Sequence, residues 1–189
     1  MWIRAIFLAS MFVFRRITNI KNMKKIVFLL FGLSVTIMCG AQSYWPDQSV
    51  KDMKGRTRNL KDFVSEKGTT LFVFWKTCCP NNITMIEELY EVWSEYKDEE
   101  KPIKVVLVSV DDQRTASRVR PIVSTNGWNW EVIMDKNGDL ARSYNIIIPP
   151  QWIAFDQSGK EIFRSKITNG SLDSGIFFGE LVDKITKNN

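Results

Sequence analysis

The sequence contains no histidine among its 189 residues. Zinc sites built from cysteine and histidine, copper sites of the Cys/Cys/His type and CxxCH haem attachment all need that side chain, so each is excluded. We therefore expect no metal ion and no other cofactor.

Cysteine is also scarce, because the chain has only Cys39, Cys78 and Cys79. Cys39 falls within the N-terminal leader discussed next, so a framework of structural disulfides has no cysteines to build it. The adjacent pair Cys78 and Cys79 is then either chemically active or incidental.

The apolar runs near the N-terminus are short. From Met23 the chain shows a cationic start, an apolar run over 26–38 and small residues up to Ala41. That run has about 13 residues, whereas a membrane-spanning helix needs roughly 20. The layout predicts a secretory signal cleaved after Ala41, with no stable membrane span afterwards. We expect a leader at 1–41 and one exported domain at 42–189, in the periplasm or cell envelope of a bacterium.

Two alternatives for the leader stay open. The apolar run can be retained as an anchor, or Cys39 can be a lipid-attachment site as in bacterial lipoproteins, although the preceding residue, Met38, is not small. Residues 1–22 look like upstream sequence translated from an early start, and they are left out of the fold argument.

The leader has no acidic residues and six basic ones. The net charge of +5 therefore comes from the leader, and the remainder has 20 basic against 21 acidic residues. A nearly neutral domain gives no electrostatic support to nucleic-acid binding.

Strands and helices alternate through the domain. Strand signals separated by helical stretches predict parallel βαβ units, and a terminal hairpin predicts an antiparallel edge, so we expect a three-layer α/β sandwich with a mixed sheet. The expected elements are a hairpin at 49–60, strands at 69–75, 103–110 and 130–134, helices at 80–97, 115–125 and 172–185, a turn and short helix at 138–144, and a hairpin of 152–155 with 161–165.

The most informative segment is LFVFWKTCCPNN at 71–82. A buried strand ends at Trp75, and Pro80 is a favoured first helical residue, so Cys79 falls at the N-cap of a helix. Unpaired N–H groups and the positive end of the helix dipole would favour its thiolate, so we expect a lowered pKa. Lys76 is either a solvated lysine or a further positive charge beside that sulfur.

This segment resembles the TlpA/ResA-like thioredoxin-fold proteins, whose strand, loop and helix read FWATWCxPC. Phe74, Trp75 and Thr77 match that pattern, Cys78 replaces the tryptophan, and Cys79 matches the nucleophilic first cysteine. The resemblance implies a thioredoxin-like α/β/α sandwich with an N-terminal hairpin extension and an internal αβ insertion.

Similarity to this family continues along nearly all of 42–189. The segments SVDD at 109–112, MDKNGDLARSYNI at 134–146 and PQWIAFDQSGKEIF at 150–163 match successive family segments. The resemblance places Pro150 at the family's cis-proline, whose loop lies beside the nucleophile and presents backbone groups to a peptide. Taken alone, the Pro149–Pro150 pair would mark only a turn.

The sequence departs from the family at the second cysteine of the CxxC motif, which normally releases the mixed disulfide. Asn82 occupies that position, and Met85 stands where some relatives have a glutamate. A bridge between Cys78 and Cys79 would be strained, because neighbouring Cα atoms lie about 3.8 Å apart and disulfides prefer roughly 4.4–6.8 Å. Cys78 is thus a redox partner in a labile bridge or a small apolar filler.

We take Cys79 and Cys78 as candidate catalytic residues. The candidate substrate-binding residues are Trp75, Pro80, Pro149, Pro150 and Trp152. Tryptophans at strand ends are more often core residues than groove residues, and this alternative also applies to Trp128 and Trp130.

The leading hypothesis is an extracytoplasmic thiol-disulfide oxidoreductase, a reductase or isomerase that works through a mixed disulfide at Cys79. Its partners would be protein thiols or disulfides and an external reductant that completes each turnover. The alternative is a thioredoxin-fold binding module that has lost turnover. A peroxidase fits less well, because Thr77 lies two residues before Cys79 and the TxxC spacing of peroxiredoxins is not met.

Overall fold

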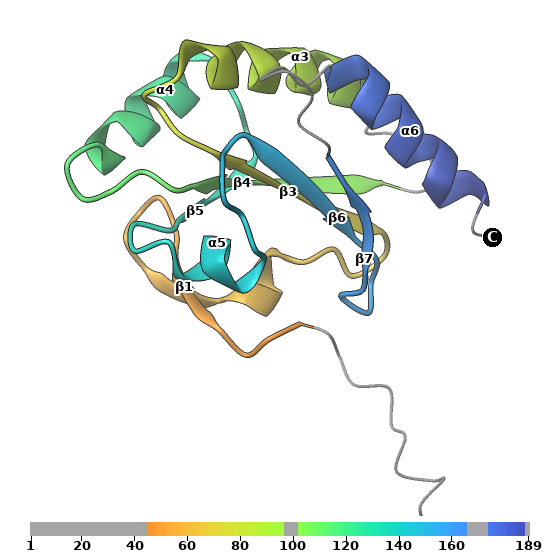
Figure 1. Ribbon diagram of the computed structural model, residues 1–189, viewed down its shortest axis with the longest axis horizontal. Helices are drawn as coiled ribbons and strands as arrows, with labels where there is room; N and C mark the ends of the chain where they lie inside the picture. Colours follow the sequence, from red (N-terminus) through yellow and green to blue (C-terminus); the bar gives the residue numbers. More distant parts are fainter. Residues whose placement is uncertain (1–44, 97–101, 166–173, 188–189) are drawn as a thin grey trace, which may run out of the picture. The chain divides into compact units, whose positions relative to one another are not determined.

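The centre of the fold is strand β3 (Thr69–Trp75), in which all seven residues are buried. Its β-branched and aromatic residues suit a strand covered on both faces. The five-stranded sheet has the order β5-β4-β3-β6-β7, with parallel pairing of β3 with β4 and β4 with β5, and antiparallel pairing of β3 with β6 and β6 with β7. The predicted mixed sheet is confirmed (Figure 1).

The computed structural model describes residues 45–96, 102–165 and 174–187. The predicted leader, its cleavage site and Cys39 lie outside these residues. Within the described ranges no helix has the length and apolar character needed to cross a membrane. The elements not yet bounded are β1 (Ser49–Lys51), β2 (Thr57–Asn59), η1 (Leu60–Phe63), α3 (Pro80–Tyr96), β4 (Ile103–Ser109), η2 (Ala116–Arg118), α4 (Val119–Thr125), β5 (Glu131–Met134), α5 (Asp139–Ser143), β6 (Gln151–Phe155), β7 (Glu161–Arg164) and α6 (Ser174–Lys187).

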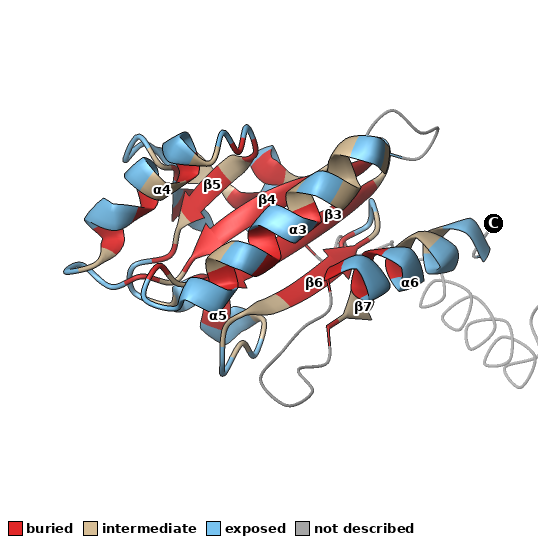
Figure 2. Cartoon of the chain, turned by 90° about the horizontal axis from the view of Figure 1, so that it is seen from above, coloured by how far each residue is buried: buried red, intermediate tan, exposed pale blue. Residues whose placement is uncertain are grey.

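Three layers result from the two faces of the sheet. Helices α3, α4 and α6 cover one face, while α5 and the β1–β2 hairpin lie on the other (Figure 1). Side chains alternate along a strand, so β3 serves both sides: Leu71, Val73 and Trp75 pack toward the helices, and Phe72 and Phe74 toward the opposite face. Burial is therefore concentrated in β3 and β4 (Figure 2).

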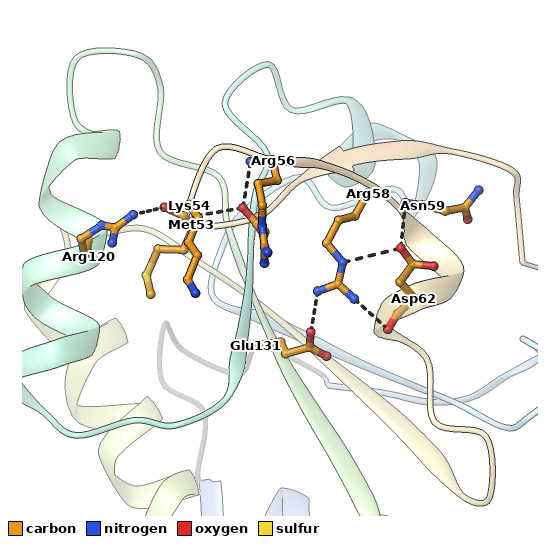
Figure 3. Close-up of polar contacts among 9 residues, drawn as sticks. Met53, Lys54, Arg56, Arg58, Asn59, Asp62, Arg120 and Glu131 are labelled. Atoms are coloured by element: carbon orange, nitrogen blue, oxygen red, sulfur yellow. Dashed lines mark hydrogen bonds and ion pairs between the residues drawn. The ribbon is translucent and has the colours of Figure 1, made fainter.

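The N-terminal hairpin is attached to the edge of the sheet beside β5. Asp52, in the turn region of the hairpin, forms an isolated antiparallel bridge with Ile133. The guanidinium of Arg58 pairs with the Glu131 carboxylate at 2.7 Å, and it also contacts Asp62 in η1 (Figure 3). The ion pair of Arg58 with Glu131 therefore fixes the hairpin against the sheet by side chains as well as by the backbone.

The predicted elements are confirmed in kind and order, with small changes at their ends. The helix predicted at 115–125 begins as the 3-10 turn η2 before it becomes α4. The first residues of the predicted closing helix, 172 and 173, and the predicted end of the helix at 97 lie outside the described residues.

Candidate active site

The candidate site lies where β3 ends and α3 begins. Trp75 ends β3 with no exposed surface, and Cys78, Cys79 and Pro80 are exposed only a few residues later. Pro80 is the first residue of α3, where a missing N–H costs nothing, so Cys79 occupies the position just before the helix. The expected position of this cysteine is therefore confirmed, and Pro80 reaches the surface beside it.

The two cysteine sulfurs are in contact. The Sγ atoms of Cys78 and Cys79 lie 3.4 Å apart, within the range of a hydrogen bond between thiols, and both cysteines are free and exposed. The interpretation of Cys78 as a filler packed behind the loop is wrong, because its side chain is on the surface beside Cys79.

The pKa of Cys79 is raised, not lowered as the sequence led us to expect. The hydrogen bond with Cys78 is the largest cause, followed by partial burial and by the charge of Cys78, with a smaller contribution from Asp111. The Lys76 ammonium works in the opposite direction. The neighbouring sulfur therefore holds the proton on Cys79 more firmly than an isolated thiol would hold it.

The buried carboxylate of Asp111 holds the cysteine loop by hydrogen bonds. Asp111 is 2% exposed and accepts hydrogen bonds from the Thr77 backbone N–H at 3.0 Å and the Thr77 hydroxyl at 2.6 Å. The Ser109 hydroxyl donates to the same carboxylate at 3.0 Å. These contacts join the residue before the cysteine pair to the segment that follows β4, which fixes one side of the cysteine loop.

Asn82 fixes the other side of the loop. It is 2% exposed, and its side-chain amide donates to the Lys76 carbonyl at 3.2 Å. Its backbone N–H donates to the Cys79 carbonyl at 2.9 Å, which closes the first turn of α3. The position of the family's second cysteine is thus filled by a structural amide that has no redox chemistry.

The Pro149–Pro150 peptide bond is cis, as expected from the resemblance. The antiparallel register of β3 and β6 ends with the pair Phe74 and Gln151, so the two prolines leave the sheet at the same end as the cysteine loop. Ile147 and Ile148, just before them, are 87% and 65% exposed. Contact between this loop and a substrate peptide stays a prediction.

The two tryptophans proposed for substrate binding are in the core. Trp75 and Trp152 have no exposed surface, because one packs edge-to-face on Trp128 and the other on Phe177 under the helices. Their side chains cannot line a surface groove, so that expectation is corrected. Trp128 and Trp130 are buried as well, at 5% and 8% exposed.

Sequence reasoning missed Asp111 as a site residue. The segment SVDD carries part of the family resemblance, but the pairing of its Asp111 with Thr77 spans 34 positions. An acidic residue directly after a buried strand was the available signal, since polar groups at the ends of parallel strands meet at one edge of the sheet.

The AhpC/TSA family pattern matches residues 41–162, which is more than half of the chain. The chain belongs to the AhpC/TSA family. This family assignment agrees with the thioredoxin-like resemblance found in the sequence, and it covers the cysteine loop, the Asp111 segment and the cis-proline loop.

Individual relatives of this AhpC/TSA protein agree with the assignment. It is 28% identical over 159 residues to the thiol-disulfide oxidoreductase ResA of Bacillus thuringiensis subsp. konkukian, covering 74% of this chain and 88% of that protein. A ResA from Bacillus cereus is 30% identical over 118 residues, covering 62% and 64% of the two chains.

Solved structures confirm the thioredoxin-like fold. A thioredoxin-like protein from Porphyromonas gingivalis superposes with a TM-score of 0.63 at 23% identity, covering 79% of this chain and 97% of that one. A secreted disulfide oxidoreductase of Mycobacterium tuberculosis, homologous to DsbE, gives 0.58 at 13% identity, covering 75% and 96%. At these identities the likeness establishes the fold alone.

Proposed function

We propose that this protein is an extracytoplasmic thiol-disulfide oxidoreductase that forms a mixed disulfide at Cys79. The observation that carries the proposal is the exposed Cys79 sulfur at the residue before α3, in a chain distantly homologous to ResA oxidoreductases. Its substrates would be disulfides or thiols of other exported proteins, and an external thiol would supply the electrons.

The raised pKa of Cys79, caused first by its hydrogen bond with Cys78, shapes the expected reactivity. Less thiolate is present at neutral pH, but a thiolate of higher pKa is the stronger nucleophile once formed. We therefore expect the reaction with a disulfide to accelerate as the pH rises from neutral to alkaline. The proposal rests on the position and exposure of the sulfur, not on unusually easy ionisation.

The test is the catalysed reduction of insulin disulfides by dithiothreitol. Cys79→Ser should lose the catalysed rate, whereas Asn81→Ser, a change to serine at an exposed residue in the first turn of α3, should keep it. A Cys79→Ser variant as fast as the unaltered protein would contradict the proposal.

A binding module is the second candidate, favoured by the buried Asn82 in place of a resolving thiol. It predicts that the unaltered protein has no rate above that of Cys79→Ser, while both bind an extended polypeptide without disulfides. Reduced and alkylated insulin B chain is a suitable probe for calorimetry. Catalysis that depends on Cys79 would exclude this candidate.

The cellular location is part of the proposal, and it rests on the signal-like layout of residues 1–41. Fractionation of native cells, followed by intact mass measurement of the protein in the envelope and cytoplasmic fractions, tests it. A mature chain that begins near residue 42, or a lipid-modified one that begins at Cys39, would support export. A full-length chain in the cytoplasmic fraction would contradict it.

A further inference from the structure

We propose that Cys78 is the resolving thiol of this site, so that Cys78 and Cys79 form a vicinal disulfide as the oxidised state of the enzyme. This inference rests on the proposed function, since it requires a mixed disulfide at Cys79 first. It assigns to Cys78 the step that a CxxC protein gives to its second cysteine.

Few cysteines are available to act as the resolving thiol. The residue three positions beyond Cys79 is the buried amide of Asn82. The remaining cysteine of the sequence, Cys39, belongs to the leader outside the described residues. Within the described ranges, Cys78 is therefore the one thiol that can reach the Cys79 sulfur inside the same molecule.

The geometry suits such a step. The two Sγ atoms are 3.4 Å apart, so forming a bond of about 2.05 Å requires an approach of only about 1.4 Å. Reacting atoms about 3–3.5 Å apart correspond to a near-attack arrangement. The attacking sulfur needs no rearrangement of strands or helices to reach its target.

The residues on both sides of the cysteine pair are held by hydrogen bonds, so formation of the disulfide requires movement of Cys78 and Cys79 alone. Thr77, before the pair, is fixed by two hydrogen bonds to the buried Asp111. Asn82, beyond it, is fixed to the Lys76 carbonyl. The exposed cysteines between these two fixed points can therefore exchange a hydrogen bond for a covalent bond while the fold stays unchanged.

The steps balance in atoms and electrons. The Cys79 thiolate attacks one sulfur of a substrate disulfide, forms a mixed disulfide, and releases the other substrate sulfur as a thiolate. The Cys78 thiolate then attacks the Cys79 sulfur and releases the second substrate sulfur. The substrate disulfide is reduced to two thiols and the cysteine pair is oxidised to a disulfide. An external dithiol reductant restores the pair by the same exchange and leaves as its own disulfide.

The product bridge would be easily reduced. Neighbouring Cα atoms lie about 3.8 Å apart, whereas the Cα atoms of ordinary disulfides are at least roughly 4.4 Å apart. The ring that a disulfide between adjacent cysteines closes is therefore strained. Strained and exposed disulfides have higher reduction potentials than structural ones. Such a bridge suits a site that must be regenerated at each turnover.

Glutathione disulfide tests the inference on the full chain, with acid trapping, alkylation and mass spectrometry of the peptide that contains Cys78 and Cys79. The unaltered protein should give a form lighter by two hydrogen atoms, with both cysteines protected from alkylation. Cys78→Ser should instead accumulate glutathione on Cys79, and Asn81→Ser should behave like the unaltered protein. Phenylarsine oxide, which needs two neighbouring thiols, should bind the reduced protein and neither single-cysteine variant.

The outcomes separate this inference from the proposed function. If the unaltered protein keeps glutathione on Cys79 and never loses the two hydrogen atoms, Cys78 is not the resolving thiol, while the mixed-disulfide proposal survives. If Cys79 takes up no glutathione even in Cys78→Ser, the proposed function itself fails.

Discussion

Asp111 offers the sharpest test of how the loop is supported. Its carboxylate accepts hydrogen bonds from three buried or nearly buried donors, namely the Thr77 N–H, the Thr77 hydroxyl and the Ser109 hydroxyl. Asp111→Ala would leave all three without this acceptor. A buried donor without a partner costs about 1–3 kcal/mol, and hydroxyls can partly reorient, so we expect a loss of about 3–5 kcal/mol of unfolding free energy.

Asp111→Asn removes the charge while keeping the shape. The amide oxygen can accept from the Thr77 N–H and the Ser109 hydroxyl, and the amide nitrogen can donate to the Thr77 hydroxyl oxygen, which both donates and accepts. The expected loss is about 1 kcal/mol. Urea unfolding measures the free energy of unfolding of both variants. An equal loss in Asp111→Asn and Asp111→Ala would refute the hydrogen-bond reasoning.

The Asp111→Asn variant also tests the electrostatic argument. The pKa of Cys79 is raised first by the hydrogen bond with Cys78, then by burial, and to a smaller extent by the Asp111 charge. Asp111→Asn should therefore lower the pKa of Cys79, measured as the pH dependence of alkylation by iodoacetamide in a Cys78→Ser background. An unchanged or higher pKa would show that the charge does not reach this sulfur.

Three further changes test the site and its scaffold. Asn82→Cys should yield a disulfide with Cys79 that resists glutathione better than the vicinal bridge, as redox titration with acid trapping would show; an unchanged midpoint would count against this. The pKa of Glu131 is influenced most by burial, which raises it, but two ion pairs outweigh burial and lower it below 4.5. The ionised Glu131 stabilises the fold above pH 4.5, and this contribution is lost as the pH falls through its lower folded pKa. Glu131→Gln should therefore reduce the acid-induced loss of stability by about 0.5–1 kcal/mol, as urea unfolding midpoints near neutral and acidic pH would show. Equal losses of stability in the variant and the unaltered protein would contradict this. Gly159→Ala should lower the free energy of unfolding by about 2–4 kcal/mol, because the φ of Gly159 is +86° and an added Cβ would lie 2.7 Å from the Trp45 ring. An unchanged urea unfolding midpoint would contradict this.

The order of strands and helices could be predicted because it depends on local patterns. The run of 69–75 is apolar enough for a strand covered on both faces, and Pro80 marks a helix start. The cis-proline loop and the position of Cys79 followed from resemblance to a family motif. Each of these features can be read within a few neighbouring residues or against a known motif.

The features that could not be predicted depend on tertiary contact. Burial of Trp75 and Trp152 results from helices packing over one face of the sheet, and no local pattern separates such core tryptophans from groove tryptophans. The predicted lowering of the Cys79 pKa was wrong. The argument from the helix start considers one sulfur alone, whereas the hydrogen bond with the Cys78 sulfur has the largest effect on this pKa. Asp111 was missed because its partner Thr77 comes from another strand end.

The hairpin attached beside β5 also protects the protein against association. β5 is an edge strand, and its free backbone groups would invite pairing with another molecule. The bridge from Asp52 to Ile133 and the ion pair of Arg58 with Glu131 cover this edge. At the opposite edge, β7 begins with Glu161 and ends with Arg164, which pair with each other and discourage a neighbouring strand from adding there. Removing the hairpin should therefore lead to aggregation before it leads to loss of the sheet.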